Sequence, residues 1–293
     1  MVKEGLVIAH LGQGIAVEHE NEIILCQPLR RLATVAVGDR VLWSPAGPDQ
    51  GRIEEVLPRR SLLIRPSRNG KIRPVAANID TIFIVIAVAP YCDFLLMDQY
   101  LAICENSKIS AAIVLNKTDL GQDETLENEL LLYRNLHYPL YRVSALTSTG
   151  LQELGAALKN QASLFSGQSG VGKSSLTNAL IPDKAVKTNA ISESTQLGRH
   201  TTTAATLYHL PDGGDLIDSP GVSIFGLADL SESQLAYGYR EFQPLLGNCR
   251  FNDCRHGPDK GCAIREAADN GTISMTRYRR FLKLKEKIPL MSS

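Results

Sequence analysis

The segment that decides the fold is a glycine-rich loop, which reads Gly167-Gln168-Ser169-Gly170-Val171-Gly172-Lys173-Ser174. It matches the phosphate-binding pattern G-x-x-x-x-G-K-S/T and lies between an apolar strand-like run and a helical stretch. The glycines let backbone amides face the phosphates, Lys173 can reach the β- and γ-phosphates, and the Ser174 hydroxyl can bind magnesium. An ordinary Gly-Ser turn is the alternative, but such a turn does not require the complete motif in this setting.

A second motif, upstream of the loop, separates guanine from adenine. It reads Asn116-Lys117-Thr118-Asp119 and follows the apolar run 111–115. The Asp119 carboxylate can accept two hydrogen bonds from guanine, whereas adenine offers no matching pair of donors and would leave the carboxylate unpaired. Asn116 and Lys117 would support the base pocket, and Ser144-Ala145 supplies a second base contact at the end of another strand-like run. The tetrapeptide alone also occurs in surface turns, but with the loop it predicts a GTP or GDP site.

Two more nucleotide motifs lie downstream of the loop. Asp218-Ser219-Pro220-Gly221 has the D-x-x-G pattern, which predicts Asp218 near magnesium and the Gly221 amide near the γ-phosphate. A simple turn is the alternative for these four residues. The polar stretch 183–204 resembles a switch segment, in which either Thr201 or Thr202 is expected to bind magnesium.

The order of these motifs is unusual. In common GTPases the phosphate-binding loop comes first and N-K-x-D comes late, but here residues 116–119 and 144–145 precede the loop, and residues 201 and 218 follow it. The sequence therefore predicts a circularly permuted GTPase domain. Such a permutation can leave a sheet intact, because nearby termini can be joined and a surface loop opened.

The remaining sequence predicts an α/β protein with two flanking modules. Residues 1–70 predict an OB-like β-barrel from five short strand-like runs, with an SH3-like barrel as the alternative. Residues 71–228 alternate strands and helices, which favours a mainly parallel sheet for the permuted P-loop GTPase domain. Residues 229–293 form the C-terminal helical module. The five barrel strands are expected at Leu6–His10, Gly14–Glu18, Ile23–Cys26, Arg40–Trp43 and Arg52–Val56.

The C-terminal module contains a cluster of metal-binding residue types. Three cysteines and one histidine lie within fourteen residues, namely Cys249, Cys254, His256 and Cys262. Such a set suits a closed tetrahedral zinc site of structural type. A short polar segment has little core of its own, so the metal would supply much of its folding energy. Chance clustering of thiols is the alternative.

Charge and hydropathy limit the classes of partner. Lysine plus arginine equal aspartate plus glutamate, at 31 each, so any contact with nucleic acid must use local patches. Two basic stretches, 59–73 and 277–287, are candidates for RNA contact, the second with Tyr278 and Phe281 interleaved. No run is apolar and long enough for a membrane helix, so we expect a cytoplasmic protein.

The whole chain resembles the ribosome small-subunit-dependent GTPase A (RsgA) family of bacteria. The likeness rests on the barrel, the permuted motifs, the cysteine-histidine cluster, Ala77-Asn78-Ile79-Asp80 and Gly198-Arg199-His200-Thr201-Thr202. It implies a late-acting assembly factor that binds the decoding region of the small ribosomal subunit, and whose GTP hydrolysis that subunit stimulates. It also implies a monomer with rRNA as partner and neither DNA nor a membrane. The resemblance also implies that residues 116–119 and 167–175 bind the nucleotide. Ser175 is thereby added to the predicted site.

The residue that activates water is not the usual one. Ras-like enzymes place a glutamine directly after D-x-x-G, but this chain has Val222 there, so intrinsic hydrolysis should be slow. His200 is the candidate replacement, with packing of the switch or RNA contact as its alternative role. The alternative function is a GTP-gated RNA-binding protein with no functionally important hydrolysis. A metabolic enzyme is more distant, because the sequence has no second catalytic constellation.

Overall fold

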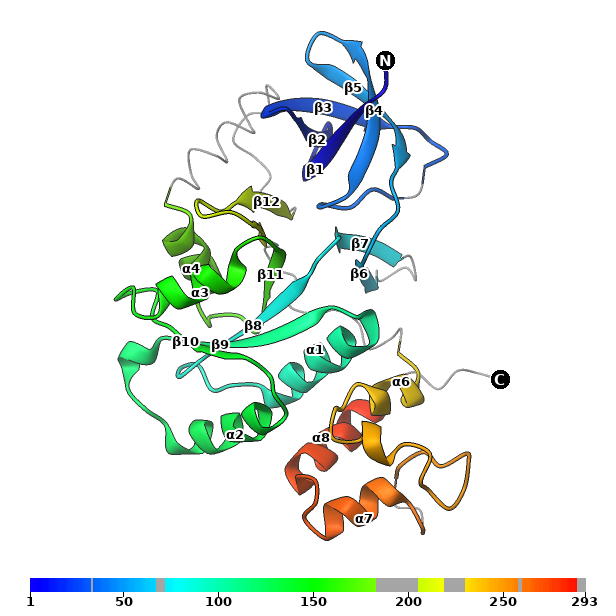
Figure 1. Ribbon diagram of the computed structural model, residues 1–293, viewed down its shortest axis with the longest axis vertical. Coiled ribbons are helices and arrows are strands. Elements are labelled where there is room, and N and C mark those ends of the chain that lie inside the picture. The colour runs from blue at the N-terminus through cyan, green and yellow to red at the C-terminus, as the bar shows by residue number, and fades with distance from the viewer. Residues whose placement is uncertain (33, 67–71, 183–204, 219–229, 258–259, 289–293) are drawn as a thin grey trace.

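The computed structural model describes residues 1–32, 34–66, 72–182, 205–218, 230–257 and 260–288. Figure 1 shows a barrel at one end, a sheet covered by helices in the middle, and a helical module beside α1. The predicted α/β class, with its two flanking modules, is confirmed.

The N-terminal barrel consists of five strands. They pair in the order β1-β2-β3-β5-β4, and β4 returns to pair with β1. The β3–β5 pairing is parallel, while the other four pairings are antiparallel. A closed five-stranded barrel with this crossed order is OB-like, which decides against the SH3-like alternative. The strands are β1 (Lys3–Leu11), β2 (Gly14–His19), β3 (Glu22–Pro28), β4 (Arg40–Gly47) and β5 (Gln50–Val56).

The central sheet has the strand order β10-β9-β8-β11-β13-β12. Its pairings are parallel except for β12, which runs antiparallel to β13 and also pairs with β1 of the barrel. The phosphate-loop strand β11 therefore lies inside the sheet, between β8 and β13. The strands are β8 (Thr81–Ala87), β9 (Ser110–Asn116), β10 (Leu140–Arg142), β11 (Ala162–Ser166), β12 (Thr206–His209) and β13 (Asp215–Asp218).

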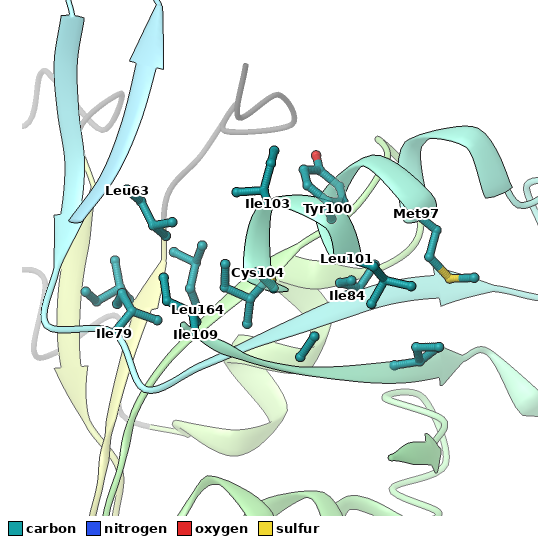
Figure 2. Close-up of a cluster of buried hydrophobic side chains, with 14 of the residues drawn as sticks. Leu63, Ile79, Ile84, Met97, Tyr100, Leu101, Ile103, Cys104, Ile109 and Leu164 are labelled. Carbon is teal, nitrogen blue, oxygen red and sulfur yellow. The ribbon is translucent and has the colours of Figure 1, made fainter. Parts of the chain in front are cut away.

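Helices cover both faces of this sheet, and β8 shows why. All seven of its residues are buried, and alternate side chains enter two different cores because successive residues of a strand point to opposite faces. Figure 2 shows the first core, in which Leu101 and Cys104 of α1 lie over the sheet and Leu63 lies at one end. The helices of this region are α1 (Phe94–Ser107), α2 (Glu124–Asn135), α3 (Leu151–Leu158) and α4 (Lys173–Leu180).

A two-stranded hairpin connects the barrel with the sheet. Strands β6 (Leu62–Pro66) and β7 (Ile72–Ala77) pair antiparallel, and Leu63 and Ala76 enter the main core. The sequence pattern indicates a basic stretch at residues 59–73 and does not predict the hairpin. Its apolar residues fix the path by which the chain leaves the barrel.

The C-terminal module contains helices α6 (Glu232–Tyr237), α7 (Ala263–Asp269) and α8 (Met275–Lys285), and a separate apolar core. Helices α6 and α8 pack against α1 of the GTPase domain. The interpretation of α8 as an RNA-facing patch is wrong for four of its residues. Tyr278 and Phe281 are buried in the module core. Arg277 and Arg280 turn inward, because they pair with Asp98 of α1, with Glu129 of α2 and with Glu241, which follows α6.

Candidate nucleotide site and metal cluster

The phosphate-binding loop has glycine at positions where a side chain would collide. A Cβ atom on Gly167 would lie 2.1 Å from the Val85 carbonyl oxygen, and one on Gly172 would lie 2.3 Å from Asn116 Nδ2. Both glycines also have positive φ, at 140° and 94°. The loop can therefore lie directly against the ends of β8 and β9 only with glycine at these two positions.

Lys173 begins α4 and folds back over the loop. Its Nζ atom donates hydrogen bonds to the carbonyl oxygens of Gly167 and Gln168, at 2.7 and 2.8 Å. Burial lowers the pKa of this ammonium group, and the negative charge of Asp218 opposes that effect. Lys173 and Asp218 thus share one site, although they come from α4 and from the end of β13.

Asn116 joins the base motif to the phosphate loop. Its buried side chain donates through Nδ2 to the Val171 carbonyl oxygen at 2.9 Å, and its Oδ1 accepts from the Ala145 backbone amide at 3.2 Å. One amide side chain therefore connects three motifs that are separated in the sequence. Because all three lie at carboxyl ends of parallel strands, they form one edge of the sheet, where α/β proteins bind ligands.

The other predicted base contacts lie next to this junction. Lys117 donates to the Ala89 carbonyl oxygen at 2.8 Å, and Thr118 Oγ1 donates to the Val143 carbonyl oxygen at 3.1 Å. Ser144 is buried, and its hydroxyl donates to the carboxylate of the exposed Asp119. The hydrogen bond joins the N-K-T-D motif to the Ser144-Ala145 motif.

Sequence reasoning assigned Gln168 only to the loop, but its side chain has a further role. Its Oε1 accepts from the Asp93 backbone amide at 2.7 Å, and its Nε2 donates to the Tyr91 carbonyl oxygen at 2.8 Å. Asp93 is the N-cap of α1, where its carboxylate accepts from the Leu96 amide. Gln168 thereby ties the phosphate loop to the start of α1. Nothing in the local sequence pattern signals this contact.

The remaining predicted site residues are either exposed at the phosphate loop or outside the described structure. Ser169, Gly170, Ser174 and Ser175 are exposed to solvent on the loop and the first turn of α4. The predicted switch and γ-phosphate residues lie outside the described residues, namely His200, Thr201, Thr202 and Gly221.

The four candidate zinc ligands come together in space. Their ligand atoms all lie within 4.8 Å of one another. The His256 Nδ1 atom lies 3.6 Å from Cys249 Sγ and 3.7 Å from Cys262 Sγ. A tetrahedral zinc ion with Zn–S of about 2.3 Å and Zn–N of about 2.0 Å separates these atoms by about 3.5 Å. The cluster therefore fits zinc of the closed structural type.

Neighbouring groups support this arrangement of ligands. Backbone amides of His256 and Arg265 donate to the sulfurs of Cys254 and Cys262, and such hydrogen bonds orient the ligands of a metal. The Tyr278 hydroxyl of α8 donates to the carbonyl oxygens of His256 and Gly257. The cluster is thus fastened to the core of the helical module.

Comparison with known proteins agrees with this geometry. A sequence model of the RsgA GTPase family matches residues 56–228. The small ribosomal subunit biogenesis GTPase RsgA of Actinobacillus pleuropneumoniae serotype 5b (strain L20) is 44% identical over 293 residues, covering 97% of this chain and 85% of its own. This chain belongs to the RsgA GTPase family.

Solved structures extend the RsgA likeness to the whole fold. YjeQ from Thermotoga maritima matches with a TM-score of 0.79 and 32% identity, over 98% of this chain and 99% of its own. YloQ, described as a circularly permuted GTPase, matches with a TM-score of 0.75 and 27% identity, over 99% and 97% of the two chains. The predicted permutation is confirmed, and this member of the RsgA family is a GTP hydrolase. Among the described residues, no helix is long and apolar enough to span a membrane.

Proposed function

We propose that this GTPase acts in the maturation of the small ribosomal subunit, with the subunit stimulating its hydrolysis of GTP. The relative from Actinobacillus pleuropneumoniae is named as a small ribosomal subunit biogenesis GTPase, which supports the first part of the proposal, and this chain covers most of the relative's length. In this proposal the barrel and the helical module bind rRNA while the GTP state times binding and release. The protein acts as a cytoplasmic monomer with domains at 1–70, 71–228 and 229–293.

The contacts of Asn116 carry the proposal for the nucleotide site. They hold the phosphate loop, the N-K-T-D motif and Ser144-Ala145 together, so the base and the phosphates of one GTP or GDP can be bound at once. Asp119 accepts from guanine, residues 167–175 surround the phosphates, and Lys173 turns from the loop carbonyls to the β- and γ-phosphates. Magnesium is bound at Ser174, a switch threonine and Asp218. Cys249, Cys254, His256 and Cys262 hold one zinc ion.

Hydrolysis requires a group that positions water. Val222 has no polar side-chain atom, so the proposal gives that role to His200, brought into place when the protein docks on the subunit. Intrinsic turnover is then slow and docked turnover fast. The same valine also favours a second candidate, a GTP-gated RNA-binding protein in which hydrolysis has no important role.

The test is GTP turnover by the purified protein with and without small ribosomal subunits. Large subunits and ATP are the controls. Stimulation by small subunits alone, with no ATP activity, is expected. His200→Ala should bind GTP normally and lose the stimulated turnover. Absence of stimulation despite GTP binding would favour the GTP-gated protein.

A further inference from the structure

An aromatic side chain of the helical module stands apart from the module core. Among the described residues of this module, four aromatic side chains are buried, namely Tyr239, Phe242, Tyr278 and Phe281. Phe251 is instead 53% exposed and Tyr237 is 49% exposed. Exposure of an apolar ring to water is unfavourable, so an exposed phenyl ring beside a groove indicates a candidate binding surface.

Phe251 forms part of a groove of about 480 Å³, which is lined by Phe251, Asp253, Cys254, Arg255 and Lys260. The guanidinium carbon of Arg250 lies 5.5 Å from the centre of the Phe251 ring. Arg250 donates its backbone amide to the Gly261 carbonyl oxygen at 2.8 Å, and a Cβ on Gly261 would lie 2.8 Å from Arg250 Cβ. The glycine therefore leaves room for Arg250 next to the ring.

The Phe251 ring belongs to a short segment of backbone that is held at both ends. Cys249 and Cys254 of the metal cluster flank it in sequence, and the Cys254 amide donates to the Phe251 carbonyl oxygen at 3.2 Å. Both ends of this short segment are thus held when the cluster binds zinc. A surface that is already ordered loses little conformational entropy when it binds a partner.

Positive charge predominates around the groove. Arg250, Arg255 and Lys260 face one acidic residue among the lining side chains, Asp253. Lys285 of α8 donates to the Arg255 carbonyl oxygen at 2.7 Å, and its ammonium group and the Arg255 guanidinium both pair with Glu232 of α6. The positive charge that can meet a phosphate is therefore mainly that of Arg250 and Lys260. An aromatic face beside arginine and lysine matches a nucleobase joined to phosphate, because the ring stacks on the base and the cations bind the backbone.

We propose that Phe251 is a stacking platform for an unpaired nucleobase of single-stranded RNA, with Arg250 and Lys260 binding the adjoining phosphates. Duplex RNA does not suit the site, because its bases are already stacked inside the helix. The inference deepens the proposed function, and it rests on that function for the source of the RNA.

The test uses the full-length zinc-loaded protein and a fluorescein-labelled, ten-nucleotide single-stranded RNA of mixed sequence at fixed salt. Phe251→Ala should weaken binding by about 5-fold or more, which corresponds to loss of one base-aromatic stack. Tyr237→Ala, the matched exposed aromatic, should bind as the wild type does. A blunt-ended duplex of the same composition, which has no unpaired base, should bind Phe251→Ala and wild type equally.

Phe251→Trp supplies a second measurement that does not depend on a loss of affinity. It should keep wild-type binding, and its added fluorescence should be quenched by the single-stranded RNA. The wild type is the reference, because its one tryptophan, Trp43, is buried in the barrel. Unchanged binding by Phe251→Ala, or unquenched fluorescence of Phe251→Trp at saturating RNA, would overturn the stacking proposal. The proposal would also be overturned, in favour of a protein partner, if a poly-glutamate peptide displaces the RNA from the wild type and the binding of that peptide is lost in Phe251→Ala.

A parallel turnover assay separates this proposal from the proposed function. If small subunits stimulate the wild type while Phe251→Ala binds the RNA normally, only the stacking site is refuted. If the wild type is not stimulated, the proposed function fails whatever the RNA binding shows.

Discussion

The GTPase domain contacts the barrel on one side and the helical module on the other. The ionic pairs are buried at the junction with the helical module and exposed at the junction with the barrel. On the side of the helical module, Arg277 is buried and pairs with Asp98 of α1 and with Glu241. On the barrel side, His209 of β12 bridges Glu18 and Asp215, with its side chain 48% exposed. Buried partners depend strongly on one another, whereas exposed pairs are screened by water and salt.

The buried junction forms a connected network. The Tyr133 hydroxyl donates to Asp98 at 2.6 Å, and the Arg277 guanidinium lies 4.9 Å from the Tyr133 ring centre. Arg280 adds a pair with Glu129 of α2 at 2.8 Å. Because these contacts come from two GTPase helices, the helical module should move with α1 and α2 as one body.

The barrel junction combines small apolar residues with exposed charge. Ala9 and Ala16 of the barrel contribute to the same core as Ile217 of β13. Ala9 also pairs with Thr206, the residue that begins β12. Since β12 lies between the switch segment and the strand that ends at Asp218, the barrel contacts the GTPase domain close to the site where the γ-phosphate is expected. This junction is the one that changes of pH and salt should alter.

The largest expected effect is that of removing the zinc ion proposed for the cysteine-histidine cluster. Chelation should unfold the segment around residues 249–262, because structural zinc supplies about 10 kcal/mol in small zinc domains. Hydrogen exchange should rise in the helical module and stay low in the barrel. Equal exchange in both regions after chelation would contradict a purely structural role of the cluster.

Breaking the buried network should have the next largest effect. Arg277→Met leaves Asp98 and Glu241 buried without their partner, which should cost about 3–5 kcal/mol of unfolding free energy. Arg279→Met on the exposed face of the same helix is the control, with a change within about 0.5 kcal/mol. Chemical denaturation followed in the helical module measures both. Similar values for the two variants would refute the central place of Arg277.

The barrel junction should be far less sensitive to loss of one charge. Glu18→Gln removes one partner of His209 and should lower the unfolding free energy by about 1 kcal/mol or less, because the pair is exposed. The effect should shrink further in high salt, whereas that of Arg277→Met should not. Denaturation of both variants at low and high salt makes the comparison, and equal salt dependence would contradict it.

The smallest effect is a pH dependence confined to the barrel side. Hydrogen bonds to Asp215 and Glu18 raise the pKa of His209 from its ordinary 6.5 to about 10. Since the folded pKa lies above the unfolded one, the stabilisation is complete below about pH 6.5 and disappears as the pH rises through about 10. The destabilisation by His209→Gln should therefore be larger at pH 6 than at pH 10. NMR titration of His209 in the wild type checks the raised pKa, and a value near 6.5 would contradict the bridge.

The sequence predicted most elements because each carries its own periodic pattern. The alternation of strands and helices expected over residues 71–228 is seen in strands β8 to β11 and in helices α1 to α4. The barrel strands and the motif edge of the sheet also follow from local alternation and turn residues. The assignment of nucleotide to individual residues, and the domain boundaries, stay predictions.

Contacts between distant residues were beyond the reach of local patterns. Arg277 looked like a surface cation because its partner Asp98 lies 179 residues away in the chain. Gln168 was assigned to a variable position of the loop, because its partners Tyr91 and Asp93 lie 77 and 75 residues away in the chain. Hairpin β6–β7 was missed because its strands are short and flank a basic turn. In each case only the tertiary fold supplies the partner.

One measurement tests the central claim, which is that Asp119 selects guanine in a GTPase triggered by the small subunit. Asp119→Asn removes the acceptor for the guanine N–H groups and offers a donor to the 2-oxo group of xanthine. With small subunits present, GTP turnover should fall by about two orders of magnitude or more, and turnover of xanthosine triphosphate should appear. Unchanged GTP turnover, with no use of xanthosine triphosphate, would contradict the assignment of the base site.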